Sequence, residues 1–316
     1  MSRYIAVIPV YNEATTIARV VAAARAYLPV IVVDDASTDG SGTRAAAAGA
    51  LLITLPGHAG KGEALRRGFT EALRRGAEAV LTLDGDGQHD PEDIPCFLAA
   101  SQQWPGSLVI GGRLESASVI PPARCQAIQV VSFWINWLGQ CYIQDSQSGF
   151  RLYPAAMLRT LAPRHGQFLF ESELLLKAVQ AGWRVHELPI RTLYPPGRVS
   201  HYSPLRDGLA ITLYLLLQGI RGWPVQLWHC YRTWRSGDCM LWRQARQRLG
   251  VACLATLGLP LLCCGVLLSL WAGQRGRALL SLIIRRLYDS HLLLASLPGR
   301  IEVSHEQYQR KHWEFV

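Results

Sequence analysis

Strand-like and helix-like segments alternate through the first 113 residues of the chain. Five short apolar runs read as buried strands, at residues 4–10, 30–33, 51–55, 79–83 and 108–110. Segments with helical spacing separate them, at residues 14–28, 40–49, 62–75 and from Pro91 onward. Strands that alternate with helices of this length need crossover connections, which join parallel neighbours. The sequence therefore predicts an α/β fold with a mostly parallel sheet.

Each of these predicted strands ends in a polar, glycine-rich segment. These segments lie at residues 9–13, 34–39, 57–62, 84–89 and 111–113. In open parallel sheets, ligands bind beyond the carboxyl ends of the strands, and all five segments would gather at that edge. A purely structural protein has no reason to place its polar residues there, so we expect a binding or catalytic site.

The segment Asp84-Gly-Asp86-Gly-Gln88-His89 carries the strongest chemical signal. Two carboxylates two residues apart at a strand end can hold a hard divalent cation such as Mg²⁺ or Mn²⁺, and such ions bridge phosphate oxygens. The two glycines allow a diphosphate to approach the backbone closely. A lone motif of this kind is more often a plain acidic turn. His89 is either a further ligand or an ordinary turn histidine.

Three further polar segments accompany this acidic motif in a fixed order. They are Pro9-Val-Tyr11-Asn-Glu13, Asp34-Asp35-Ala-Ser37-Thr-Asp39-Gly and Gly60-Lys61-Gly62. Lys61 opens a predicted helix whose N-terminus would attract an anion. Each segment taken alone also reads as a turn with a helix cap, in which Asn12, Ser37 or Asp39 would cap the following helix. All four segments on successive strand ends are hard to explain by capping alone.

The chain between residues 114 and 204 is less regular. Pro121-Pro122 interrupts it, and an aromatic-rich amphipathic helix is predicted at residues 126–138. Residues 145–153 form a turn-rich polar segment, followed by a predicted helix at 171–181 and a strand at 184–193. We place the end of the first domain at residue 204 and a second region at 205–316.

The second region differs in composition from the first. It carries a net charge of +8, out of +9 for the whole chain, and contains an uncharged run at residues 208–220. Tryptophans and arginines cluster between residues 221 and 242, which suits a membrane interface better than a nucleic-acid groove. Residues 251–271 carry no charge and would reach about 31 Å as a helix, enough to cross a bilayer. The alternatives for residues 251–271 are a re-entrant hairpin bent at Pro260 and a buried helix of a globular protein. Residues 279–297 could form a second span that returns the chain across the bilayer, but their charged residues make that span costly.

The ordered motifs resemble those of the inverting family 2 glycosyltransferases of the GT-A fold, which have a Rossmann-like sheet. Further segments resemble the branch that contains dolichyl-phosphate mannose synthases and polyprenyl-phosphate glycosyltransferases. These segments are Gly111-Gly-Arg113, Asp145-Ser-Gln-Ser148-Gly-Phe-Arg151-Leu-Tyr153, Phe170-Glu-Ser-Glu173 and Glu187-Leu-Pro189-Ile. The resemblance covers residues 5–193, and a hydrophobic tail is usual in that branch.

The resemblance implies a role for each matching residue. The nucleotide-sugar site would comprise Pro9, Tyr11, Glu13, Asp35, Lys61 and Asp84, and the metal site Asp84, Asp86 and Gln88. The acceptor phosphate would be bound by Arg113, Arg124, Ser148 and Arg151. The catalytic set would comprise Asp86, Arg113, Arg151, Asp145 and Glu173. The chain departs from the mannose synthases at Ile128, near the place where they carry a serine.

The chemistry expected of these residues is the inverting transfer of a sugar. A hydroxyl acceptor needs a general base, whereas a phosphate acceptor is already anionic. Glu171, Glu173 and Asp145 are possible bases. Alternatively, the two glutamates mark an exposed helix start, and Asp145 pairs with Arg113 or Arg151.

The main hypothesis for function combines the motifs with the tail. It is transfer from a nucleotide sugar to a membrane lipid, a polyprenyl phosphate, at the cytoplasmic face of the membrane, with no nucleic-acid partner. The alternatives are a glycolipid or pigment-lipid hydroxyl as acceptor, or a non-catalytic scaffold that binds nucleotide sugars.

Overall fold

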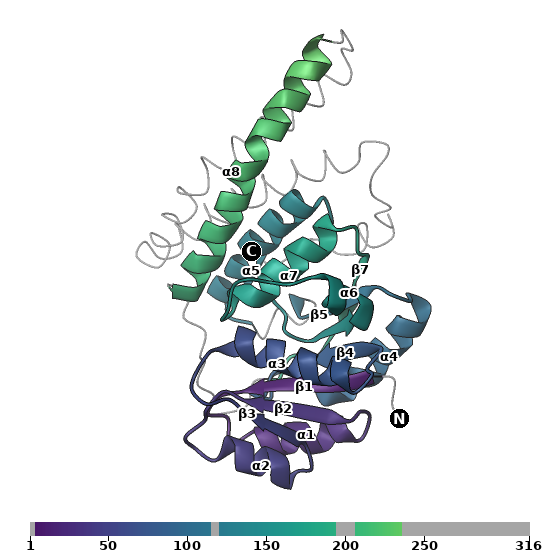
Figure 1. The fold of residues 1–316 in the computed structure, drawn as a ribbon, viewed down its shortest axis with the longest axis vertical. Coiled ribbons are helices and arrows are strands. Elements are labelled where there is room, and N and C mark those ends of the chain that lie inside the picture. Colours follow the sequence, from purple (N-terminus) through teal and green to yellow (C-terminus); the bar gives the residue numbers. More distant parts are fainter. Residues whose placement is uncertain (1–3, 115–119, 194–205, 236–316) are drawn as a thin grey trace. The chain divides into compact units, whose positions relative to one another are not determined.

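The computed structural model describes residues 4–114, 120–193 and 206–235 (Figure 1). The chain divides into two compact units. The first comprises Met1–Ser132 and Ile143–Ile211, and the second comprises Phe133–Tyr142 and Thr212–Val316. The predicted domain boundary at residue 204 lies outside the described residues.

A seven-stranded sheet forms the centre of the first unit. Its strand order is β3-β2-β1-β4-β6-β5-β7. The strands are β1 (Tyr4–Val10), β2 (Val30–Asp34), β3 (Leu51–Thr54), β4 (Ala79–Thr82), β5 (Leu108–Gly112), β6 (Arg151–Pro154) and β7 (Val185–Pro189). All neighbours run parallel except β6, which is antiparallel to both β4 and β5. The prediction of an α/β fold with a mostly parallel sheet is confirmed.

Helices cover both faces of this sheet because its central strands are apolar on both sides. Figure 1 shows α1 (Ile17–Arg25) and α2 (Ser41–Ala47) on one face of β1–β3 and α3 (Lys61–Arg74) on the other. Ile8, Val20 and Phe97 belong to the core on the α1 side. On the other side, a Cβ on Gly68 of α3 would collide with Val7, so this glycine lets the helix approach β1 closely.

Other helices of the first unit follow the later strands. They are α4 (Ile94–Gln103), which continues a short 3₁₀ turn at Pro91–Asp93, α6 (Ala155–Thr160) and α7 (Leu169–Gln180). The sequence did not predict α6, nor the strand β6 within the polar segment 145–153. Strand β6 is only four residues long, begins with an arginine and ends with a proline, so it shows no strand periodicity. Pairing with β4 and β5 is what makes it a strand.

Two long helices contribute to both units. Helix α5 (Pro122–Gly139) begins earlier than predicted, and α8 (Arg206–Arg235) contains the uncharged run. Within the second unit, the rings of Trp134 and Trp137 meet edge to face at 5.4 Å. A Cβ on Gly219 of α8 would lie only 3.4 Å from Trp137 and 3.5 Å from Trp134, so this glycine allows close helix packing.

One face of α8 exposes large apolar side chains with helical spacing. These are Leu213, Leu217, Ile220, Leu227, Trp228 and Tyr231. None of the helices in the three described ranges is long and apolar enough to cross a membrane. The predicted span at 251–271 and the return span at 279–297 lie outside the described residues.

Candidate active site

Most of the predicted site residues line one pocket in the first unit, at the carboxyl ends of the parallel strands. These are Pro9, Tyr11, Glu13, Asp35, Lys61, Asp84, Asp86, Gln88, Arg113, Arg124 and Arg151. Asp145, Ser148 and Glu173 are not among its lining residues. The pocket therefore brings together segments that lie far apart in the sequence, such as the end of β1 and the start of β6.

Asp35 and Tyr11 meet a residue that the sequence analysis did not single out, His58. The Asp35 carboxylate accepts hydrogen bonds from the backbone N–H groups of Ala59 and Gly60, both at 2.7 Å. It also lies 2.9 Å from Nδ1 of His58, whose ring stacks on Tyr11 at 4.1 Å. Position was the only available signal for His58, because it immediately precedes the Gly60-Lys61-Gly62 segment.

The loops after β1 and β2 bond mainly to each other, although Asp39 Oδ1 also accepts from the backbone N–H of Ser41, the first residue of α2, at 3.0 Å. Thr16, not Asn12, is the N-cap of α1, and it makes no side-chain cap bond. Asn12 adopts a left-handed conformation with φ 53°, and its Oδ1 accepts from the backbone N–H of Thr38 at 2.9 Å. Ser37 Oγ in turn accepts from the Asn12 N–H at 2.9 Å. The capping interpretation of Asn12 and Ser37 is therefore wrong: these side chains fix the rim of the pocket.

Lys61 connects two carboxylates inside the pocket. Its Nζ lies 2.7 Å from Asp84 Oδ1 and 2.8 Å from Glu171 Oε2. Burial disfavours the charged form of Lys61, but the two carboxylates outweigh burial and raise its pKa. Burial likewise opposes ionisation of Asp84, and Lys61 nevertheless lowers the pKa of that carboxyl. A Cβ on Gly149 would lie 2.9 Å from both charged groups, so only glycine leaves room for this pair.

The acidic motif is held in place by its own backbone. Asp86 Oδ1 accepts from the Gln88 N–H at 3.0 Å, and Nδ1 of the buried His89 accepts from the Asp84 N–H at 3.1 Å. His89 thus acts as an ordinary turn histidine, and burial lowers its pKa. Within the described residues, no group of three or more His, Cys, Asp or Glu side chains is arranged to hold a metal ion.

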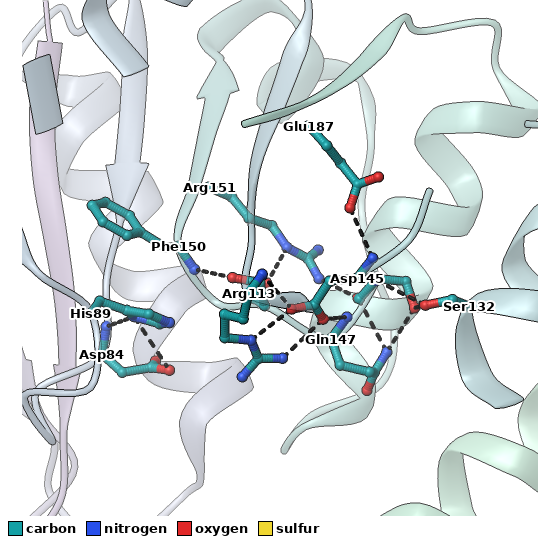
Figure 2. A network of polar contacts seen from close by, with 11 residues as sticks. Asp84, His89, Arg113, Ser132, Asp145, Gln147, Phe150, Arg151 and Glu187 are labelled. Atoms are coloured by element: carbon teal, nitrogen blue, oxygen red, sulfur yellow. Dashed lines mark hydrogen bonds and ion pairs between the residues drawn. The ribbon is translucent and has the colours of Figure 1, made fainter. Parts of the chain in front are cut away.

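Arg113 makes a bidentate ion pair with Asp145. Its Nε and Nη2 lie 2.7 and 2.9 Å from the two Asp145 oxygens, and its backbone N–H also donates to Asp145 at 3.2 Å. Burial opposes ionisation of Asp145, but Arg113 lowers the pKa of the carboxyl. Figure 2 shows Asp145 between Arg113 and Glu187, so of the two pairings considered for Asp145 the structure has the one with Arg113.

Arg151 is buried and directs its donors at backbone carbonyls. Nε donates to Ser148 O at 2.6 Å, Nη2 to Ser146 O at 2.7 Å and Nη1 to Glu171 O at 3.0 Å. These bonds join the polar segment 146–148 to the first turn of α7. Ser148 is itself fully buried, and its Oγ accepts from the Phe150 N–H at 3.3 Å.

The two glutamates at the start of α7 have different surroundings. Glu171 lines the pocket, and within the described structure its buried Oε1 has no hydrogen-bond partner. Glu173 lies outside the pocket, where its carboxylate binds Lys177 Nζ at 2.7 Å and the backbone N–H groups of Arg164 and His165 at 3.0 and 2.9 Å. Its bonds hold the segment before α7.

The wall of the pocket formed by α5 is largely apolar. Ala127, Ile128 and Val131 line it, together with the partly buried Arg124 one turn earlier. The pocket thus has an acidic end at Asp84 and Asp86, and a side where arginines adjoin an apolar surface.

Comparison with known proteins gives consistent results. A family model described as glycosyl transferase family 2 matches residues 5–124. The undecaprenyl-phosphate mannosyltransferase of Micrococcus luteus is 30% identical over 207 residues, which cover 60% of this chain and 82% of that protein. The polyprenol monophosphomannose synthase of Mycolicibacterium smegmatis is 29% identical over 206 residues, covering 60% of this chain and 76% of that protein.

A solved structure shares the fold. Glucosyl-3-phosphoglycerate synthase from Mycobacterium tuberculosis, crystallised with Mn²⁺, uridine diphosphate and phosphoglyceric acid, matches with a TM-score of 0.53 at 20% identity. The match covers 68% of this chain and 76% of that chain. The sheet, the pocket at its carboxyl edge and these similarities lead to one conclusion: the chain belongs to glycosyl transferase family 2 and is a glycosyltransferase.

Proposed function

We propose that the protein transfers a sugar from a nucleoside-diphosphate donor to a polyprenyl phosphate, with inversion, at the cytoplasmic face of a membrane. The observation that carries the proposal is the composition of the pocket, which combines an acidic motif with arginines and an apolar wall. The names of the Micrococcus and Mycolicibacterium relatives specify lipid-phosphate acceptors, which fits this composition.

The nucleoside would bind where β1 and β2 end. Tyr11 and His58 supply stacked rings beside Asp35, and nucleobases stack well on aromatic side chains. Pro9 and Glu13 line the same end of the pocket. The bonds that Asp35 receives from Ala59 and Gly60 support this arrangement: with a nucleoside beside Asp35, the start of α3 would lie next to it and Lys61 would lie close to the donor diphosphate.

A divalent cation such as Mg²⁺ or Mn²⁺ fits the residues at the acidic end. Asp84 and Asp86 offer carboxylate oxygens, the ligands these ions prefer. Gln88 Nε2 is buried without a partner in the described structure, and a rotation of that amide would turn its oxygen toward the same space. When bound, the ion would neutralise negative charge that develops on the diphosphate as the sugar leaves.

Lys61 would add a fixed positive charge at the same place. Its ammonium group is held by Asp84 and Glu171 before any substrate arrives, so little reorganisation is needed when the leaving group becomes negative. Stabilisation of charge at a pre-arranged site is commonly the largest contribution to such a reaction.

The acceptor phosphate would bind Arg113 and Arg124. An arginine held by a carboxylate presents a rigid fork of donors, which suits a phosphate. The apolar residues Ile128 and Val131 would contact the start of the lipid chain. A phosphate oxygen is already anionic and can attack the sugar without a general base, which agrees with the bonds that engage Asp145 and Glu173 elsewhere.

Association with the membrane would involve α8 and the residues that follow it. The exposed apolar face of α8 is flanked by Arg221, Arg232 and Arg235, a pattern typical of helices in a membrane interface. The uncharged run at 251–271 would then cross the bilayer. The net positive charge of residues 205–316 would add attraction to anionic lipids. Such membrane attachment would give the pocket access to a lipid acceptor.

A hydroxyl acceptor is the second candidate, and one observation favours it. Glu171 Oε1 lies buried in the pocket without a hydrogen-bond partner in the described structure. A carboxylate oxygen in that position can accept the proton of an attacking hydroxyl. The product would then be an ordinary glycoside of a glycolipid or pigment lipid.

The decisive experiment incubates membranes that contain the protein with radiolabelled nucleotide sugars and extracts the lipid product. A polyprenyl phosphate acceptor gives a product that mild acid hydrolyses, whereas a glycoside survives. Transfer should fall by at least about 10²-fold in Asp86→Ala and in wild type treated with EDTA. Full activity after exhaustive chelation would contradict the metal, and an acid-stable product would favour the hydroxyl acceptor.

A further inference from the structure

Glu187 contacts the polar segment that follows α5, although it does not line the pocket. It lies on β7 opposite Ile110 of β5, the strand that leads to Arg113. Its Oε2 accepts from the Gln144 N–H at 2.6 Å, and its Oε1 accepts from the Asp145 N–H at 2.8 Å (Figure 2). Each carboxylate oxygen thus holds one of two consecutive backbone donors.

These two bonds continue directly into the pocket. Glu187 fixes the backbone of Asp145, and the side chain of Asp145 holds the Arg113 guanidinium by two bonds of 2.7 and 2.9 Å. Arg113 is the member of this series that lines the pocket. A shift of the Asp145 backbone would therefore move the guanidinium that faces the substrates.

Glu187 is partly buried, and its two specific bonds to backbone N–H groups argue against a role in packing alone. Burial raises the pKa of Glu187 to about 7, and the negative charge of Asp145 adds to this effect, while the two N–H groups oppose it. The backbone is also adapted to it, since a Cβ on Gly112 would lie 3.3 Å from Glu187 Oε1. What a carboxylate supplies here, and a neutral side chain does not, is two acceptors for two adjacent N–H groups.

We propose that Glu187 is a positioning residue for the transfer reaction: it fixes segment 144–145 so that Asp145 holds Arg113 in the orientation that binds the acceptor. The inference rests on the proposed function for the identity of the acceptor. It does not require Glu187 to touch any substrate.

The test begins with Glu187→Gln, which keeps the size of the side chain but replaces one acceptor oxygen by an N–H₂ group. One of the two backbone N–H groups then loses its acceptor. We expect kcat/KM for the acceptor to fall by about 10–100-fold, the usual effect of removing a residue that orients a ligand-binding group. Donor affinity, measured by calorimetry, should change less than about two-fold, because Tyr11, Asp35 and Asp84 are untouched.

Asp93→Asn is the matched control. Asp93 is a buried carboxylate that, like the partly buried Glu187, accepts a backbone N–H, here from Arg191 at 2.9 Å, but it does not line the pocket or contact Asp145. The Asp93→Asn variant should be less stable than wild type but should keep the wild-type kcat/KM for the acceptor. Equal losses of acceptor kcat/KM in the two variants would overturn the inference.

A double-mutant cycle separates positioning from general destabilisation. If Glu187 acts through Asp145, adding Glu187→Gln to Asp145→Asn should lower acceptor kcat/KM little further. Additive losses would refute the inference. If wild type transfers to no lipid phosphate, the proposed function fails instead, and the same cycle with the acceptor that the enzyme uses decides the role of Glu187.

Discussion

The ammonium group of Lys61 lies 2.7 Å from Asp84 Oδ1. The Asp84 carboxylate is also a ligand of the proposed metal ion. The same ammonium lies 2.8 Å from Glu171, so one cation neutralises two carboxylates in the pocket. The pair joins the start of α3 to the end of β4 and connects the donor end of the pocket to α7. The Lys61 ammonium and the proposed metal ion would therefore share one ligand.

This competition predicts the behaviour of Lys61→Met. The variant leaves two carboxylates without their common counter-ion and should be less stable than wild type by roughly 2 kcal/mol, below the cost for a fully buried pair because Asp84 is 29% exposed. Mg²⁺ should raise the melting temperature of the variant more than that of wild type, because in the variant it no longer shares Asp84 with an ammonium group. Thermal unfolding with and without Mg²⁺ measures both effects.

Arg67→Met is the control for this experiment. Arg67 lies on the same helix and pairs with Glu63 on the exposed surface. The Arg67→Met variant should have nearly the same stability and the same response to Mg²⁺ as wild type. An identical Mg²⁺ response in Lys61→Met and wild type would show that the ion does not use Asp84.

His58→Ala should weaken nucleotide binding. The His58 ring stacks on Tyr11 at 4.1 Å and binds Asp35, so its loss removes part of the proposed surface for the base. An aromatic contact is worth about 0.5–1.5 kcal/mol, or roughly a 2–12-fold loss in affinity. Calorimetry with nucleoside diphosphates measures it. His186→Ala, which removes a ring stacked on Trp104 away from the pocket, should bind nucleotide normally.

Arg124→Ala and Arg151→Ala should have different effects. Arg124 lines the pocket from α5, so its removal should raise the acceptor KM by about ten-fold with little loss of stability. Arg151 is buried against three carbonyl groups, and its removal should destabilise the protein by roughly 3 kcal/mol or more. Urea unfolding together with acceptor kinetics distinguishes them. A stable Arg151→Ala protein with a specific acceptor defect would instead assign Arg151 to the phosphate.

Glu173→Gln should lower stability in a pH-dependent way. Burial opposes ionisation of Glu173, but Lys177 and the N–H groups of His165 and Arg164 lower its pKa to about 2. An acid with a lowered pKa stabilises the fold fully above its unfolded value, near 4.5, and loses that contribution as pH falls toward 2. Urea unfolding should show a deficit of about 2 kcal/mol at pH 7 that shrinks at pH 3. A constant deficit would contradict the assignment.

The exposed face of α8 predicts a membrane phenotype. Replacing both Leu217 and Trp228 by Glu should reduce transfer to a lipid acceptor in membranes, since each apolar side chain contributes about 1.5–3 kcal/mol when buried. Nucleotide affinity should stay unchanged. Leu51→Glu, at an exposed leucine on β3, is the control and should leave transfer intact. Equal transfer in all three proteins would exclude a membrane role for this face.

The sequence alone determined the order of the elements around the site. Apolar runs such as residues 30–33 are strands and Lys61 opens a helix, because local periodicity and punctuation decide these features. The carboxyl ends of parallel strands meet at one edge, so the polar segments after β1, β2 and β4 were expected together. Their common pocket agrees with that expectation, since each segment lies directly at the end of its strand.

Only the tertiary structure decided which charged groups pair. Asp145 had two possible arginine partners, and the antiparallel insertion of β6 between β4 and β5 settled the choice in favour of Arg113. The same packing placed Glu187 on segment 144–145. Such contacts join residues far apart in the chain. Their geometry depends on strand order and burial, which residue spacing does not encode.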